Sequence, residues 1–263
     1  MATDSKAFPL VVRNWSDLSS LIEHFSRFSA HDWLFRGVTD ETHGLTAKIG
    51  REKTRALKES KRIPYRAADE AALFKMFKAQ ALSHTQRAPV TQLEWLALAQ
   101  HFGVPTRLLD WTESLLVAAW FAVEKSGVKQ DKRNSAIWVT RGVRHISEDS
   151  KQDPLKITDP CVYRPAHVST RIAAQASVLM VCPGPTKEAK LKFVRKIVVE
   201  RSAEFTIKKR LNACGVNRRL LFPDLQGLAE HLAWLHKHDY LAGYREHGDD
   251  IPGTPDSEGQ SWL

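Results

Sequence analysis

Apolar side chains recur every three or four residues through much of the first half of the chain, which is the spacing of helices with one buried face. Residues 16–28 show this pattern, with Ser16 as the expected N-cap. Residues 66–85 predict a second, alanine-rich helix, whereas the polar and basic residues 43–63 have no clear period. We therefore expect a mobile basic loop that leads into the second helix.

The clearest helix signal is the segment "VTQLEWLALAQHFG", in which Thr91 and Glu94 form a capping box and Gly103 ends the pattern. A short extended piece follows, and then an almost wholly apolar helix over residues 113–123 with Thr112 as its expected cap. A helix that is apolar on every side is typical of a protein core. This segment therefore predicts a buried helix.

From residue 135 onward the pattern changes to runs rich in Val and Ile that are bounded by Gly, Pro or charged residues, as in strands. These runs cover residues 135–142, 176–184 and 192–201. The sequence contains no linker, internal repeat or low-complexity tract. The simplest interpretation is a single α+β domain over residues 1–245, with helices in the first half and a mixed sheet, followed by a disordered tail at 246–263.

The composition agrees with a globular domain, because 43% of the 263 residues are apolar and can form a sizeable core. No run of about 18 apolar residues is present to span a bilayer, and "MATDSKAFPL" lacks the pattern of a secretory signal. We therefore predict a cytoplasmic protein without a membrane partner. Cys161, Cys182 and Cys214 form no C-x-x-C pair and are expected to be reduced and buried.

The formal net charge of +9 raises the question of a phosphate-rich partner, because clusters of Lys and Arg bind polyanions. The basic residues are dispersed over the segments "REKTRALKESKR", "KEAKLKFVRK" and "KKR". Dispersed charge of this kind is typical of a solvated surface. We expect weak binding to nucleic acid.

Several common sites are missing from the sequence, namely the phosphate-binding loop, the dinucleotide fingerprint, the H-E-x-x-H zinc motif and the G-x-S-x-G elbow. Nucleoside triphosphate hydrolysis and serine hydrolysis are therefore disfavoured. His231, His236 and His238 lie near one another, but without a partnering carboxylate or thiolate they are interpreted as a solvated helix end. No metal is expected.

Three stretches place polar residues where local structure does not require them. Arg36 and Gly37 follow the apolar run "WLF", and Asp110, Trp111 and Thr112 occupy a junction between a strand and a helix. Free backbone amides at such a junction favour phosphate or other anions. Alternatively, Thr112 is only a helix cap and Asp110 only pairs with Arg107.

The third stretch is "YRPAHVSTRIAAQASVLMV", in which polar residues precede a very apolar strand. His167, Arg171 and Gln175 are its candidate residues. Polar groups at the entrance of such a strand must find partners, whether these are structural or functional.

The segments "WLFRG", "ALAQHFGVPTRLLDWTESLLVAAWFA", "YRPAHVSTRIAAQASVLM" and "LFPDLQGLA" together resemble the FRG domain family, which is named for the Phe-Arg-Gly motif present here at residues 35–37. The resemblance extends over roughly residues 15–235. Four motifs in the same order are more specific than any one of them.

The arrangement also looks like an ADP-ribosyltransferase site of the arginine–serine–glutamate type. This resemblance implies an ADP-ribosyltransferase-like fold and NAD as a substrate, held by Arg36 through its phosphates and ribose. It implies that Thr112 occupies the serine position, before a helix with an A-x-x-F-A pattern at residues 118–122. By the same resemblance, the residues that bind the nucleotide are Arg36, Gly37, Trp111, His167 and Arg171.

The ADP-ribosyltransferase resemblance implies a catalytic glutamate before a later strand. This sequence has Gln175 there instead, in "AAQASVLMV". Gln175 can bind a ribose hydroxyl but cannot supply negative charge to a developing cation. Either Asp110 or Glu113 provides the acid, or the domain binds a nucleotide without turning it over.

The favoured function is therefore NAD-dependent ADP-ribosyl transfer or NAD cleavage, as in a toxin or a phage-defence effector, with Arg36, Asp110, Thr112 and Gln175 as catalytic residues. The acceptor, a protein or a nucleic acid, is left open. The alternative is a non-catalytic module that binds a nucleotide or nucleic acid.

Overall fold

The computed structural model of the chain describes most of the 263 residues. The described residues are 8–29, 31–51, 54–58, 61–64, 66–85, 88–126, 133–147, 150, 152–165, 170–238 and 240. The chain divides into two compact units, residues 1–216 and residues 217–263. The predicted tail at 246–263 lies outside the described residues, and the prediction of one domain over 1–245 stays a prediction.

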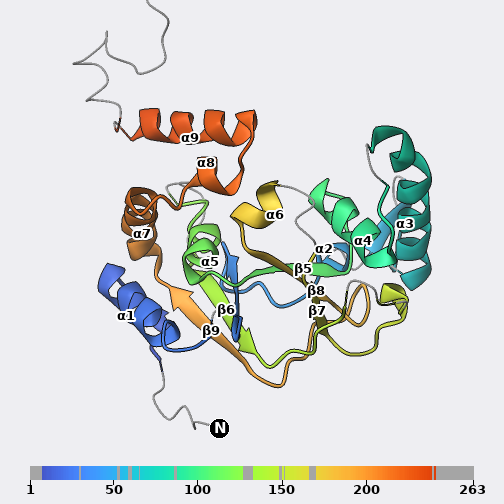
Figure 1. The fold of residues 1–263 in the computed structure, drawn as a ribbon, viewed down its shortest axis with the longest axis horizontal. Helices are drawn as coiled ribbons and strands as arrows, with labels where there is room; N and C mark the ends of the chain where they lie inside the picture. Colours follow the sequence, from blue (N-terminus) through green and yellow to red (C-terminus); the bar gives the residue numbers. More distant parts are fainter. Residues whose placement is uncertain are drawn as a thin grey trace, which may run out of the picture. The chain divides into compact units, whose positions relative to one another are not determined.

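A seven-stranded mixed sheet forms the centre of the first unit (Figure 1). Its strand order is β1-β9-β6-β2-β5-β8-β7. β1 pairs with β9 in parallel, and the other neighbours are antiparallel. The strands of this sheet are β1 (Val11–Val12), β2 (Trp33–Val38), β5 (Leu108–Thr112), β6 (Ser135–Arg141), β7 (Cys161–Tyr163), β8 (Ser177–Val181) and β9 (Val194–Val199).

Helices alternate with these strands along the sequence. The predicted α+β class is therefore confirmed. The α-helices of the first unit are α1 (Trp15–Phe25), α2 (Lys48–Arg51), α3 (Ala67–Ala81), α4 (Gln92–His101), α5 (Leu115–Ala122), α6 (Thr170–Ala174) and α7 (Arg201–Ala213). Two short 3₁₀ helices are η1 (Leu82–His84) and η2 (Pro154–Lys156).

The helix ends show which side chains cap them. The capping box of Thr91 and Glu94 at the start of α4 is confirmed. Two other predicted caps are wrong, because Asn14 caps α1 and Ser114 caps α5 by accepting bonds from backbone amides three residues further on. Thr112 instead accepts a hydrogen bond from the backbone amide of Ser114.

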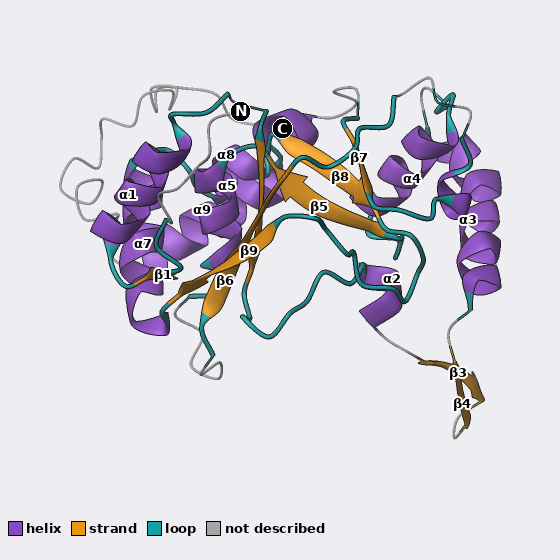
Figure 2. Cartoon of the chain, turned by 90° about the horizontal axis from the view of Figure 1, so that it is seen from below, coloured by secondary structure: helices purple, strands orange, loops and turns teal. Residues whose placement is uncertain are grey.

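The predicted loop over residues 43–63 is partly wrong, because it contains the short helix α2 and the strands β3 (Thr54–Lys58) and β4 (Lys61–Pro64). These strands pair antiparallel in a sheet of their own. Figure 2 shows this hairpin apart from the seven-stranded sheet. A hairpin without a strong alternation of apolar and polar residues gives little signal in the sequence.

Two clusters of the core lie on opposite faces of the sheet around β5. Leu108 packs with Leu96 of α4 and Leu179 of β8, while the next residue, Leu109, packs with Val178 on the other side. This alternation is the normal period of a strand. Asp110 therefore faces the same side as Leu108, where α4 lies.

Gly37 allows helix α5 to lie directly on strand β2. A Cβ atom at Gly37 would lie less than 3 Å from the carbonyl oxygen of Ala118 and 2.6 Å from the backbone nitrogen of Ala122. Ala118 and Ala122 are fully buried. The glycine of the Phe-Arg-Gly motif and the alanines of the A-x-x-F-A pattern thus form one close helix–strand contact.

The second unit contains the helices α8 (Arg218–Leu221) and α9 (Leu225–Lys237). Gly227 of α9 lies so close to the carbonyl oxygen of Phe222 that it has no room for a side chain. In α9, His231 is buried, and burial followed by the charge of Arg219 lowers its pKa. His231 is thus buried, and the predicted solvated helix end is wrong for this residue.

Within the described residues, no helix combines the length and apolar character that a membrane crossing requires. Cys161 and Cys182 are buried free thiols, as predicted, but Cys214 is exposed. Burial raises the pKa of the Cys182 thiol to about 12.

Candidate functional site

The candidate site lies where strands β2 and β5 separate. Only Phe35 of β2 and Thr112 of β5 form a residue pair between these strands, although β2 pairs with β6 along its whole length. The residues that would continue the ladder are Arg36, Gly37, Asp110 and Trp111, and all four line a cavity of about 420 Å³. The separation of two adjacent strands therefore creates the opening.

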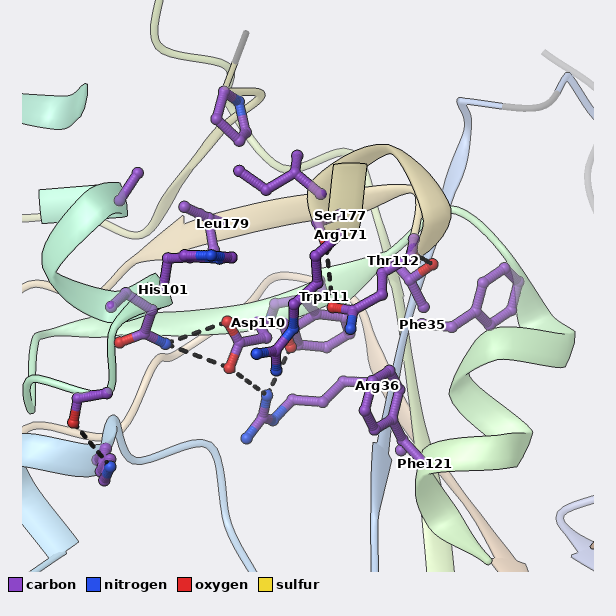
Figure 3. A pocket seen from close by; sticks show the side chains of 18 residues that line it. Phe35, Arg36, His101, Asp110, Trp111, Thr112, Phe121, Arg171, Ser177 and Leu179 are labelled. Carbon is purple, nitrogen blue, oxygen red and sulfur yellow. Dashed lines mark hydrogen bonds and ion pairs between the residues drawn. The ribbon is translucent and has the colours of Figure 1, made fainter. Parts of the chain in front are cut away.

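Most of the candidate residues predicted from the sequence line this cavity. Arg36 and Gly37 come from β2, Asp110, Trp111 and Thr112 from β5, and Arg171 and Gln175 from α6 and the residue after it (Figure 3). The remaining candidate, His167, lies outside the described residues. Three stretches far apart in the sequence thus reach one cavity.

Arg36 is a deeply placed charged group of the cavity, since only 10% of its side chain is exposed. One terminal nitrogen donates to the backbone carbonyl of Asp110 at 2.5 Å and lies 4.0 Å from a carboxylate oxygen of the same residue. The Nε atom is buried and has no hydrogen-bond partner among the described residues. Burial lowers the pKa of Arg36, while Asp110 acts to raise it. The cation is incompletely compensated.

Asp110 is held on its other side by Gln100 of α4. The Gln100 amide nitrogen donates to both carboxylate oxygens, at 3.1 and 3.2 Å. The orientation of this amide is fixed, because the hydroxyl of Thr106 donates to its oxygen at 2.6 Å while accepting from the amide of Leu108. Gln100 was missed in the sequence, although it lies in the same motif as Asp110.

The structure does not pair Asp110 with Arg107, the structural alternative that the sequence left open. Arg107 instead binds Glu70 of α3 with two hydrogen bonds of 2.9 and 2.7 Å and also donates to the carbonyl of Pro154. Both charged side chains are only 2% exposed. Arg107 therefore connects α3 to β5 and leaves Asp110 to the cavity.

Thr112 and Gln175 are joined directly. The Thr112 hydroxyl donates to the backbone carbonyl of Gln175 at 2.7 Å, and the Gln175 side chain accepts a long bond of 3.5 Å from Ser177. Ala176, between Gln175 and Ser177, has a φ of 43°, a left-handed conformation that is strained for alanine. This strained turn directs the chain from α6 into β8 at the wall of the cavity.

Glu113, one of the two acids that the sequence offered, does not line this cavity. It lines a smaller cavity of about 210 Å³ together with Trp33 and Phe35. Its carboxylate accepts from Arg164 at 2.7 Å and contacts His31 at 2.8 Å. Only Asp110 of the two acids therefore shares the space of Arg36 and Gln175.

Further residues in the cavity wall went unnoticed in the sequence. Lys48 of α2 and His101 of α4 add basic groups, and burial, followed by the charge of Arg171, lowers the pKa of His101. Among the described lining residues, Arg36, Lys48 and Arg171 are permanent cations and Asp110 is the only carboxylate. The cavity therefore favours an anionic ligand.

Among the described residues, the structure offers no candidate metal site. The described residues include no group of three or more His, Cys, Asp or Glu side chains arranged to hold a metal ion.

Comparison with known families identifies one segment of the chain. The model of the FRG domain matches residues 31–131, which include Arg36, Gly37, Asp110, Trp111 and Thr112. The match supports the FRG family and ends before Arg171 and Gln175. Neither the curated proteins nor the solved structures gave a match.

Proposed function

We propose that this protein binds NAD in the cavity between β2 and β5 and catalyses ADP-ribosyl transfer or NAD cleavage. The observation that carries the proposal is the guanidinium of Arg36, which is nine-tenths buried yet has no carboxylate in direct contact among the described residues. A buried charge without full compensation is costly, and a ligand phosphate would complete it. The proposed ligand is thus a nucleotide with at least one phosphate group.

The other walls suit the remaining parts of such a ligand. Arg171 and Lys48 provide further positive charge, and Phe121, which is partly exposed, provides aromatic surface. Gln175 offers an amide to a ribose hydroxyl. A volume of about 420 Å³ falls within the usual range of ligand pockets, roughly 300–1,000 Å³.

The order of the strands also supports an ADP-ribosyltransferase-like arrangement. The arginine and threonine positions belong to β2 and β5, and the glutamine lies two residues before β8; these are three adjacent strands of one sheet. The helix with the A-x-x-F-A pattern, α5, follows the middle strand and packs on the first at Gly37. Motifs in the order that the resemblance requires thus converge on one cavity.

In the proposed reaction the bond between nicotinamide and the ribose carbon breaks, and nicotinamide leaves with the bonding electrons. A nucleophile, either water or an acceptor side chain, then attacks the cationic sugar carbon and loses its proton. Asp110 is the proposed source of the negative charge that stabilises this cation, since Glu113 lines a different cavity. Arg36 holds the phosphates, and Thr112 holds Gln175 in place.

The test is release of nicotinamide from NAD by the purified protein, followed by chromatography, together with intact-mass analysis after incubation with NAD and lysate. We expect nicotinamide release by the parent and none by Arg36→Ala. Arg36→Lys is the matched control, because it retains the charge but not the paired donors of the guanidinium. Binding of NAD without release of nicotinamide by the parent would contradict catalysis.

A second candidate function is a non-catalytic module that binds a nucleotide or nucleic acid. It is favoured by Gln175, whose amide lacks the charge of a glutamate, and by the Thr112 hydroxyl, which is already engaged by a backbone carbonyl. Polarization titrations with RNA and DNA at several salt concentrations test it. Tight binding that weakens steeply with salt would favour this module.

A toxin or phage-defence role would follow from NAD consumption inside a cell. Expression of the parent and of Arg36→Ala in a bacterial host, with NAD measured in extracts, tests this role. We expect NAD to fall only with the parent.

A further inference from the structure

Asp110 occupies an unusual place in the cavity, because its carboxylate faces a cation that it does not contact directly. The nearest carboxylate oxygen lies 4.0 Å from the Arg36 guanidinium, whereas the two Gln100 bonds are 3.1 and 3.2 Å long. An unrestrained carboxylate would approach an arginine to about 2.8 Å. Gln100 therefore holds the carboxylate back from Arg36.

The two members of the pair differ in their freedom to move. The Arg36 side chain is 10% exposed and is enclosed between β2 and β5, while the Asp110 side chain is 64% exposed. Rotation of Asp110 away from Arg36 would bring it into water at little cost in solvation, but Arg36 has no such alternative. Any competition for Arg36 is therefore resolved by movement of Asp110.

We propose that Asp110 acts as an internal anion beside Arg36, which a ligand phosphate displaces, and that this displacement frees the carboxylate to stabilise positive charge elsewhere in the cavity. The inference rests on the proposed function in one respect, since the released carboxylate would supply the negative charge that Gln175 lacks. Binding of the phosphate to Arg36 would then also free the carboxylate of Asp110 to act. Before phosphate binds, the Asp110 carboxylate would stay near Arg36, held by Gln100.

Gln100 sets the strength of this competition. Its amide cannot turn away, because Thr106 donates to the amide oxygen at 2.6 Å. By keeping the carboxylate at 4.0 Å, Gln100 leaves Arg36 only partly compensated and therefore open to a phosphate. Without Gln100, Asp110 would close on Arg36 and compete more strongly.

The test compares affinities for inorganic pyrophosphate and ADP-ribose, measured by calorimetry, between the parent and two variants. Asp110→Asn should bind both probes about tenfold more tightly, because it removes a like charge a few ångströms from the phosphate. Gln100→Ala should bind them more weakly than the parent. Adenosine, which has no phosphate, should show no gain with Asp110→Asn.

Asp159→Asn is the matched control, because Asp159 is exposed, lies outside the cavity wall and changes the net charge equally. Equal or weaker binding of pyrophosphate by Asp110→Asn would overturn the inference. A gain with Gln100→Ala as large as with Asp110→Asn would overturn the role of Gln100.

A second measurement decides the matter if the parent binds neither probe. Asp110→Asn leaves Arg36 without its nearest anion, so that pyrophosphate should raise its melting temperature more than that of the parent. The double variant Arg36→Ala/Asp110→Asn should lose this difference, and an equal rise in the parent and Asp110→Asn would overturn the inference.

Nicotinamide release separates the two proposals. If Asp110→Asn binds pyrophosphate more tightly but neither the parent nor any variant releases nicotinamide, the proposed catalytic function is wrong. The proposed role of Asp110 as an internal anion would still hold.

Discussion

Two arginines are buried next to β5, and they are satisfied in opposite ways. Arg107 and its partner Glu70 are each 2% exposed and joined by two short hydrogen bonds, and a backbone carbonyl adds a third. Arg36 is also nearly buried, but it has one direct bond, to a backbone carbonyl, and a carboxylate at 4.0 Å. The charge of Arg107 is thus fully compensated by protein groups, whereas the charge of Arg36 is compensated only in part.

The difference is the basis on which Arg36, unlike Arg107, is proposed to bind a ligand. A buried ion pair tolerates its loss of hydration only when the geometry is good and the remaining donors are bonded. Arg107 meets this condition through protein groups alone. Arg36 meets it only in part, at the wall of a cavity that contains two further permanent cations among its described lining residues. The incomplete pairing, and not burial itself, points to a ligand.

The largest effect should follow from removal of Glu70. Glu70→Ala leaves Arg107 charged and buried without a partner, which should reduce the free energy of unfolding by about 3–5 kcal/mol. Chemical denaturation monitored by circular dichroism measures this change. Glu23→Ala is the control, because the Glu23 and Arg27 pair is exposed and should contribute less than about 1 kcal/mol. Equal stability of both variants would remove the basis for calling Arg107 structural.

The next effect separates the packing of the Phe-Arg-Gly motif from its charge. Gly37→Ala forces a methyl group against the backbone of α5 and should reduce the free energy of unfolding by about 1–3 kcal/mol or more. The same overpacking is expected for Ala118→Leu, on the other side of this contact. Gly184→Ala is the control, since a Cβ there meets only the flexible side chain of Lys187 at normal distances. Equal melting curves for Gly37→Ala and Gly184→Ala would contradict the close contact.

A smaller effect on stability, but a decisive one on binding, is expected at Arg36. Arg36→Ala should keep the melting temperature within a few degrees, because it removes a poorly compensated charge and leaves Asp110 exposed to water. It should also abolish the stabilisation of the parent by NAD, which depends on binding to the native state alone. Thermal unfolding with and without NAD measures both. Destabilisation by Arg36→Ala as large as that by Glu70→Ala would make the two arginines equivalent.

The smallest effect concerns His101, the basic group at the edge of the same cavity. Burial and the charge of Arg171 lower its pKa, so that the unfolded chain binds a proton at His101 more readily than the folded one. This contribution to stability should be present above the unfolded pKa of about 6.5 and be lost as the pH falls below it. His101→Gln should reduce the loss of stability between pH 7 and pH 5.

Arg171→Ala provides the companion measurement for His101. Removal of this neighbouring charge should reduce the same loss by a smaller amount than His101→Gln. An unchanged pH dependence in both variants would count against a depressed pKa at His101.

Much of the fold could be predicted from local patterns. The capping box of α4, the apolar α5 and the valine-rich strands depend on residues close in sequence, and the structure contains all of them. The capping of α5 by Ser114, the hairpin of β3 and β4 and the exposure of Cys214 were not predicted. Two caps were misplaced because neighbouring polar residues fit the same pattern, and the hairpin has little apolar periodicity.

The residues of the candidate site likewise include some that the sequence predicted and some that it missed. Arg36, Asp110, Thr112, Arg171 and Gln175 stood out because each is a polar residue beside an apolar run, and all five line the cavity. Gln100, Lys48 and His101 did not stand out, since they lie at helix positions where polar residues are ordinary. Whether the five residues act on NAD stays a proposal.

The sequence by itself determined the α+β class, the buried helix after β5 and the polar residues that interrupt apolar runs, because periodicity, capping and turn chemistry are local properties. The tertiary structure decided which acid shares a cavity with Arg36 and which arginine is fully paired. Those results depend on the separation of β2 from β5 after a single residue pair and on the position of Glu70 in α3, far away in the sequence. Contacts between distant segments set burial and charge compensation, and neither quantity can be read from the residues of one segment alone.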